Sequence, residues 1–289
     1  MTSADSARLA TVPAAPERLD LESIELALLL EGIYRQYGFD FREYASASLK
    51  RRVWRRVHAE RLDTIAALIG RVLHDPDVME RLLLDLSINV TSMFRDPSFY
   101  RALREKVVPQ LRTYPFTRIW VAGCSSGEEV YSLAILLAEE GLYERTRIYA
   151  TDINEVVLDR ARSGVFPLDK MREYTDNYIR AGGTRSFSEY YLARYDGALF
   201  DRALTENVVW APHNLVQDGP FNTFNLVLCR NVMIYFDRQL QNRVHRLFLD
   251  SLERLGILAL GHKESIRFTE VEGAYEELDG EERIYRRAR

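Results

Sequence analysis

Two glycines and three carboxylates along one stretch of the chain could bind a nucleotide-like ligand. Gly123 and Gly127 flank a small polar turn that follows an apolar run, and Glu128 and Glu129 begin the helical pattern behind it. A second apolar run further along the chain ends in Asp152. This is the layout of a nucleotide-binding strand–turn–helix–strand unit, in which the glycines let the backbone approach the ligand and the final acid accepts hydrogen bonds from ribose hydroxyls.

The two acids at the start of the helix indicate which ligand fits. A dinucleotide fold places a pyrophosphate at this helix N-terminus, where free N–H groups favour an anion. Glu128 and Glu129 would repel a pyrophosphate, whereas they suit the cationic end of S-adenosylmethionine. An alternative interpretation is that both acids only stabilise the helix terminus. An NAD-dependent oxidoreductase is a competing hypothesis, but the acidic turn and the missing third glycine argue against it.

A second polar segment, residues 230–237, directly follows an apolar run that ends in Cys229. Ligands of open α/β sheets bind beyond the carboxyl ends of the strands, so this segment should face the same cleft. It lacks the Asn-Pro-Pro-aromatic motif found in many enzymes that methylate amino groups. Arg230 and Tyr235 suit an anionic acceptor instead, unless Arg230 is structural and Tyr235 belongs to the core. The polar connector at 89–96, taken alone, indicates only a linker.

Alternating strand and helix patterns must position these segments. Strands are expected at 118–122, 147–151, 208–211, 226–229 and 257–261. Helices are expected at 128–139, 156–163 and 238–252. This alternation predicts an α/β fold with a mostly parallel sheet and helices on both faces. Residues 266–268 and 284–287 are predicted to close the sheet as a hairpin.

The remaining segments predict further domains. Residues 21–86 carry apolar side chains at helical spacing, with helix starts at Thr64 and Asp75, and so form an all-α domain. We expect a disordered lead-in at 1–20, a linker at 87–97 in which Asp96 caps the next helix, and the α/β domain at 98–289. The stretch at about 170–205 is too long for a connector, which predicts an inserted antiparallel β-subdomain or a lid.

Bulk properties exclude several classes of protein. No apolar run approaches the roughly 20 residues that span a bilayer, and the N-terminus lacks the apolar segment of a secretory signal, so a cytoplasmic protein without membrane insertion is expected. Cys124 and Cys229 have no partners at metal spacing, which predicts reduced core thiols and no metal site. The net charge of −4 argues against a general nucleic-acid binder.

Five motifs in order resemble the CheR family of chemotaxis protein methyltransferases. They are residues 89–96, 123–129, 213–215, 230–237 and 260–264. The resemblance covers nearly the whole chain, including the helical N-terminal region. It implies a Rossmann-like class I methyltransferase domain, an inserted β-subdomain and an all-α N-terminal domain. It also implies an enzyme that uses S-adenosylmethionine to methylate glutamate side chains of bacterial chemoreceptors, with S-adenosylhomocysteine as product. Met93 stands where the family usually has Phe, and Lys263 where it usually has Ser.

The resemblance also assigns roles to single residues. Those that would bind the cofactor are Asn89, Thr91 and Arg95 at the domain junction, Gly123 and Glu129 at the turn, Asp152 at the ribose, Asn214 and Leu215 at the adenine, and Arg230 and Asn231. Arg95 and Tyr235 would be catalytic, nearest the transferred methyl group. A glutamate acceptor, with a reference pKa near 4.3, is already ionised at neutral pH and needs no general base, so catalysis would be mainly positioning. His213 and His262 are then predicted to be structural.

A cluster of cations in the helical domain suggests how a partner is bound. The cluster contains Lys50, Arg51, Arg52, Arg55 and Arg56. The apolar residues between them define an inward face, so these charges are expected to project outward and to bind an acidic partner, unless they form only a solvated surface. In the family, this domain contacts the receptor helices, and the β-subdomain of some members binds a receptor C-terminal tether. A monomer is expected. A non-receptor signalling protein as the substrate, or a catalytically silent docking protein, are the alternatives.

Overall fold

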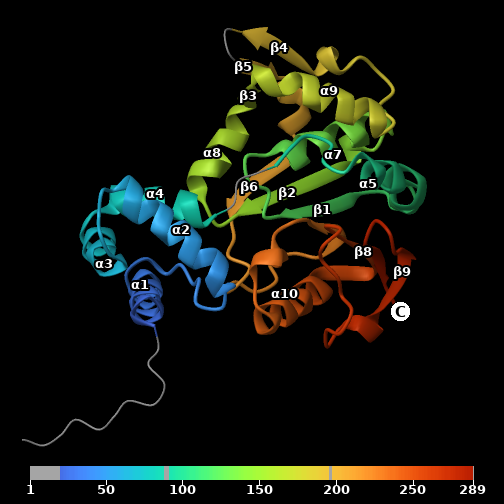
Figure 1. Cartoon of the computed structure of the whole chain (residues 1–289). Coiled ribbons are helices and arrows are strands. Elements are labelled where there is room, and N and C mark those ends of the chain that lie inside the picture. Colours follow the sequence, from blue (N-terminus) through green and yellow to red (C-terminus); the bar gives the residue numbers. More distant parts are fainter. Residues whose placement is uncertain (1–19, 88–90, 195–196, 289) are drawn as a thin grey trace, which may run out of the picture.

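The computed structural model describes residues 20–87, 91–194 and 197–288. Its N-terminal helices are α1 (Leu21–Tyr37), α2 (Ser46–Ala59), α3 (Ile65–His74) and α4 (Pro76–Leu86). The side chains of Thr64 and Asp75 accept hydrogen bonds from the N–H groups of Ala67 and Asp77, both at 3.1 Å, which confirms the two predicted helix starts. These four helices enclose an apolar core of their own, to one side of the sheet (Figure 1).

A seven-stranded sheet forms the centre of the rest of the chain, with strand order β6-β2-β1-β7-β8-β10-β9. The strands are β1 (Thr117–Ala122), β2 (Thr146–Asp152), β6 (Val208–Pro212), β7 (Phe224–Cys229), β8 (Leu252–Leu260), β9 (Tyr275–Asp279) and β10 (Ile284–Arg287). Neighbouring strands pair in parallel from β6 through β2, β1 and β7 to β8. Strand β10 pairs antiparallel with both of its neighbours, β8 and β9. The predicted mostly parallel, Rossmann-like sheet is therefore confirmed.

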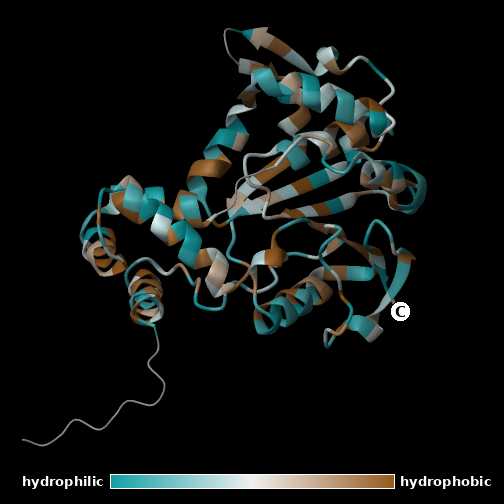
Figure 2. Cartoon of the chain, in the orientation of Figure 1, coloured by the Kyte–Doolittle hydropathy of each residue, from teal (hydrophilic) through white to brown (hydrophobic). Residues whose placement is uncertain are grey.

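Helices cover both faces of this sheet. They are α5 (Pro97–Ala102), the π-helical turn η1 (Leu103–Val107), α6 (Val108–Leu111), α7 (Glu128–Glu139), α8 (Glu155–Ser163) and α10 (Arg238–Ser251). Along β1, Ile119 and Val121 belong to the core that includes Leu133 of α7, whereas Trp120 packs against Phe248 of α10. Successive side chains of a strand point to opposite faces, so both layers are buried. In Figure 2, α10 carries hydrophobic and hydrophilic segments side by side, as expected for a helix with one buried side.

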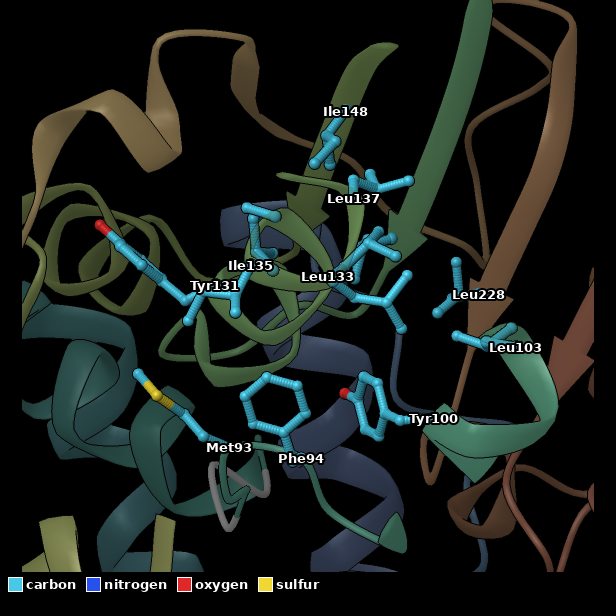
Figure 3. Close-up of a cluster of buried hydrophobic side chains, with 14 of the residues drawn as sticks. Met93, Phe94, Tyr100, Leu103, Tyr131, Leu133, Ile135, Leu137, Ile148 and Leu228 are labelled. Atoms are coloured by element: carbon cyan, nitrogen blue, oxygen red, sulfur yellow. The ribbon is translucent and has the colours of Figure 1, made fainter. Parts of the chain in front are cut away.

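The segment after the domain junction packs against α7. Figure 3 shows Met93, Phe94 and Tyr100 pointing toward α7 side chains such as Leu133. The N–H of Phe94 donates to Ser132 Oγ at 2.8 Å. Met93 is fully buried in this core, so the methionine that departs from the family pattern fills apolar space there.

A small antiparallel sheet with order β3-β5-β4 is inserted in the second half of the chain. Its elements are β3 (Val165–Pro167), α9 (Met171–Arg180), β4 (Tyr191–Arg194) and β5 (Gly197–Phe200). The sheet begins before residue 170, earlier than the sequence pattern indicates. Short 3₁₀ helices connect the elements: η2 (Tyr143–Arg145), η3 (Leu168–Lys170), η4 (Phe187–Tyr190), η5 (Arg202–Thr205), η6 (Met233–Tyr235) and η7 (Glu272–Ala274).

Two local expectations are wrong. Residues 266–268 form a turn, with Phe268 at φ 63° and 82% exposed, and β9 takes the hairpin position beside β10 instead. Asp96 precedes α5 but makes no side-chain cap, because its carboxylate pairs with Arg230. Among the described residues, no helix is long and apolar enough to cross a membrane.

Candidate active site

A pocket lies at the carboxyl ends of the parallel strands, where β1, β2, β6 and β7 end, and the helical N-terminal region closes one side of it. It contains about 990 Å³ of empty space including its open mouth. Its lining comes from Phe41, Tyr44, Leu86, Ser87, Thr91, Ser92, Arg95, Gly123, Cys124, Ser125, Glu129, Asp152, Ile153, His213, Asn214, Leu215, Arg230, Asn231, Val232, Tyr235 and Phe236. The structure thus brings together all the residues predicted to bind cofactor or to be catalytic, except Asn89, which lies outside the described residues.

The turn after β1 needs its glycines. Gly123 has φ 71°, and a Cβ atom there would lie 2.5 Å from Val232 Cγ2. Gly127 has φ 97°, and its Cβ would lie 2.8 Å from Ala161 Cβ. Side chains at these two positions would strain the backbone and collide with the neighbouring segments. Gly123 therefore lets the turn approach the 230–235 loop at the pocket, and Gly127 lets it pack against α8.

Asp152 ends β2 with its carboxylate at the pocket wall. One oxygen accepts from the N–H of Ser125 at 2.9 Å, and the other accepts from the N–H of Asn154 at 3.0 Å. Burial raises the pKa of this carboxyl, against the effect of the backbone N–H groups. Each carboxylate oxygen keeps a further lone pair that can accept from a hydroxyl. The geometry is compatible with the predicted ribose contact.

The two acids that begin α7 differ in surroundings. Glu129 lines the pocket and accepts from Arg230 Nη1 at 2.9 Å. Glu128 is buried away from it, accepting from Ser126 Oγ at 2.7 Å and from the Tyr174 hydroxyl at 3.3 Å, and burial raises the pKa of its carboxyl. Of the pair, Glu129 is the one that can contact a ligand.

Arg230 is buried and held between two acids, with only 2% of its side chain exposed. It donates to Glu129 and, at 2.7 Å, to Asp96, and its guanidinium lies 3.9 Å from the centre of the Phe99 ring. The interpretation of Arg230 as a ligand for an anionic acceptor does not fit these contacts. Arg230 therefore orients Glu129 and, through Asp96, connects the junction segment to the end of β7.

Glu264 lies in the motif at 260–264 and is the main residue to which the sequence assigned no role. Its carboxylate is buried and accepts four backbone N–H groups, from Gly261 and Met233 at 2.7 Å and from Asn231 and Val232 at 2.8 Å. These bonds hold Asn231 at φ 61°. The signal that could have found this residue is an acid placed soon after the apolar run Ile257–Leu260 that ends β8. Lys263 beside it is exposed and does not line the pocket.

The helical N-terminal region contributes Arg52 to the surroundings of Tyr235. The guanidinium of Arg52 lies 4.8 Å from the centre of the Tyr235 ring, and it donates to the carbonyl of Leu86 at 2.6 Å and to Ser48 Oγ at 2.8 Å. Arg52 is 5% exposed. The prediction that its charge projects outward is therefore wrong, because the side chain reaches over the helix end toward the pocket.

Most of the other predicted basic-patch residues have intramolecular partners. Lys50 pairs with Asp20 and Glu22, Arg55 and Arg56 share Asp85, and Arg56 also pairs with Glu60. Arg51 is exposed. The concentrated free positive patch inferred from the sequence is thus largely neutralised within the helical region itself.

The two histidines and the two cysteines differ in their surroundings, and His213 and Cys124 line the pocket. The His213 ring packs edge-on against Trp120, with centroids 5.1 Å apart, and burial lowers the pKa of His213. His262 is exposed and contacts Glu282 at 2.7 Å. Cys124 and Cys229 are buried free thiols whose pKa is raised by burial. Within the described residues, no group of His, Cys, Asp and Glu side chains could hold a metal ion.

Comparison with known proteins gives a consistent result. The model of the family "CheR methyltransferase, SAM binding domain" matches residues 89–283, and that of "CheR methyltransferase, all-alpha domain" matches residues 24–87. A protein of Pseudomonas putida named "Putative methyltransferase Cher3" is 51% identical, covering 92% of this chain and 97% of its own. "Chemotaxis protein methyltransferase" of Listeria innocua is 30% identical (81% of this chain, 87% of its own), and that of Escherichia coli is 28% identical (88% of each).

The matched domain and the pocket agree on the cofactor. A pocket lined by Glu129 rather than by phosphate-binding groups, with the Asp152 carboxylate bonded to the turn at Ser125, fits a ligand that has a cationic methionine end and a ribose. The chain belongs to the CheR family of S-adenosylmethionine-dependent methyltransferases.

Proposed function

We propose that this chain transfers a methyl group from S-adenosylmethionine to glutamate side-chain carboxylates of bacterial chemoreceptors. The observation that carries the proposal is a single pocket in which the acids Asp152 and Glu129 share the cavity with Arg95 and Tyr235. The two acids suit the cationic cofactor. The Arg95 guanidinium and the Tyr235 hydroxyl suit a carboxylate acceptor. Relatives named "Chemotaxis protein methyltransferase" that align over most of this chain support the same substrate.

The residues would work by binding and orientation. S-adenosylmethionine, when bound, supplies an electrophilic methyl group. Asp152 would accept from the ribose hydroxyls, and Glu129, fixed by Arg230, would hold the cationic methionine end. Arg95 and the Tyr235 hydroxyl would orient the acceptor carboxylate. A glutamate carboxylate is ionised at neutral pH, so these residues need not remove a proton, and alignment supplies the catalysis.

The acceptor protein would meet two further surfaces. Strand β4 is at the edge of the small sheet, and Leu192 on it is 63% exposed. An exposed edge can pair with an extended peptide, so we propose it for a receptor tether. Helix α2 would face the receptor helices mainly through Arg51, since its other cations are paired or buried.

Labelled methyl transfer into native membranes tests the proposal. The purified chain is incubated with labelled S-adenosylmethionine and membranes of the source organism, with excess S-adenosylhomocysteine as the control. We expect alkali-labile label on receptor glutamates that mass spectrometry maps to cytoplasmic helices. Label confined to a non-receptor protein would select that alternative substrate. Cofactor binding without any transfer would select the silent docking protein.

A further inference from the structure

A short seam joins the helical N-terminal region to the segment that carries Tyr235. Residues 43–45 run antiparallel to residues 235–237, with Tyr44 bridged to Phe236. The N–H of Ala45 donates to the carbonyl of Tyr235, and the N–H of Asp237 donates to the carbonyl of Glu43, both at 2.9 Å. The seam therefore bonds the backbone of Tyr235 itself, although the two segments are far apart in the sequence.

Side chains reinforce the seam on both sides. The Tyr44 and Phe236 rings meet edge to face with centroids 4.8 Å apart, and both rings line the pocket. Glu43 forms an ion pair with Arg243 of α10. Edge-to-face ring pairs add about 0.5–1.5 kcal/mol beyond their buried area. Together with Arg52 over the Tyr235 ring, these contacts make the helical N-terminal region a wall of the site.

Tyr235 needs such support because its local structure is short. It ends η6, a single 3₁₀ turn, and α10 begins only after Asp237. Glu264 fixes the start of this loop through Met233, and Asp237 fixes its end by capping α10 at Leu240. Between these two points, the bond from Ala45 holds the Tyr235 carbonyl.

We propose that residues 43–45 are a positioning element that aligns Tyr235 for methyl transfer. The inference rests on the proposed function, because it takes Tyr235 as a residue that touches the acceptor. The N-terminal region then has a role within the catalytic step, in addition to any contact with the acceptor protein. Since a misplacement of about 1 Å can cost roughly 100-fold in rate, loss of the seam should slow turnover more than it weakens cofactor binding.

Ala45→Pro removes the N–H that donates to the carbonyl of Tyr235. Ala45 has φ −58°, which a proline ring matches, so the backbone of residue 45 accepts the substitution, and the donor is replaced by a ring carbon that pushes against the Tyr235 carbonyl. Ser46→Pro is the matched control, because Ser46 is the first residue of α2, a position that favours proline. A second pair uses ion pairs on α10: Arg243→Gln breaks the contact with Glu43, and Arg246→Gln breaks one with Glu270 outside the seam.

Each variant is measured for kcat in the membrane assay, for S-adenosylhomocysteine affinity and for hydrogen exchange of a peptide spanning 233–237. We expect A45P to lower kcat at least about tenfold, with cofactor affinity within about twofold of wild type, and to speed exchange at Asp237. R243Q should shift these quantities in the same direction, and S46P and R246Q should match wild type.

Exchange and kcat of A45P equal to those of S46P would overturn the inference. If wild type itself transfers no methyl group, the proposed function fails, whereas the exchange comparison still decides whether the seam holds Tyr235. Melting temperatures of all variants separate this local effect from a loss of folding.

Discussion

Glu264→Gln is the sharpest test of how the active-site loop is held. The two oxygens of Glu264 each accept two backbone N–H groups: Val232 and Met233 on one, Asn231 and Gly261 on the other. A glutamine keeps one acceptor oxygen and turns an NH₂ group toward the other two donors. Two buried N–H groups then lose their acceptor, and each loss lowers the free energy of unfolding by about 1–3 kcal/mol.

Removing a buried charge offsets some of that cost, since burial raises the pKa of Glu264 and so disfavours its ionised form. We expect the free energy of unfolding to fall by about 2–4 kcal/mol, measured by urea denaturation. Glu277→Gln, at a half-exposed acid that pairs weakly with Arg267, is the control and should change stability by less than about 0.5 kcal/mol. Wild-type stability of E264Q, together with unchanged turnover, would refute the assigned role of Glu264.

Substitutions at three other residues test the rest of the site and the core beside it. Asp152→Ala should weaken S-adenosylhomocysteine binding roughly 10- to 100-fold by calorimetry, whereas Asp159→Ala, at an exposed acid of α8, should leave it unchanged; equal affinities would contradict the ribose placement. Tyr235→Phe should lower kcat with little change in cofactor affinity, and wild-type kcat would remove its hydroxyl from the mechanism. His245 is buried, and burial lowers its pKa to about 4. The unfolded chain then binds more protons between the ordinary histidine pKa and pH 4, so stability should fall with decreasing pH over that window by up to about 3 kcal/mol, and His245→Gln should flatten this slope in denaturation curves.

Local patterns predicted the elements that local physics determines. Helix α7 spans residues 128–139 as expected, because glycine ends the turn before it and apolar side chains recur through it at helical spacing. The strand ends at Ala122 and Cys229 also agree with the pattern, and β2 ends at Asp152, one residue beyond the predicted strand, which is why the pocket residues converge. These features depend on nearest neighbours along the chain.

Features that depend on distant partners were not predictable. Arg52 occupies a polar position of an amphipathic helix, and only the packing of α4 and the Tyr235 loop shows that it is buried. Asp96 has the sequence context of a helix cap, but a guanidinium from the end of β7 competes for its carboxylate. Residues 266–268 have the apolar content of a strand. Glu264, just before them, accepts four backbone N–H groups and thereby fixes the path of the chain that leads into them.

The buried ion cluster around Arg230 explains why a cationic ligand suits this pocket. Two carboxylates, Glu129 and Asp96, share one guanidinium, so the cluster contains more acid than base. Burial alone would lower the pKa of Arg230, which is enclosed by the Phe99 ring, but its acidic neighbours raise that pKa and keep it cationic. An isolated buried charge is costly, and Glu129, the acid of the two that lines the pocket, shares its guanidinium with Asp96, so its charge is only partly compensated. A sulfonium and an ammonium group would offset the excess negative charge of this cluster, whereas a pyrophosphate would increase it.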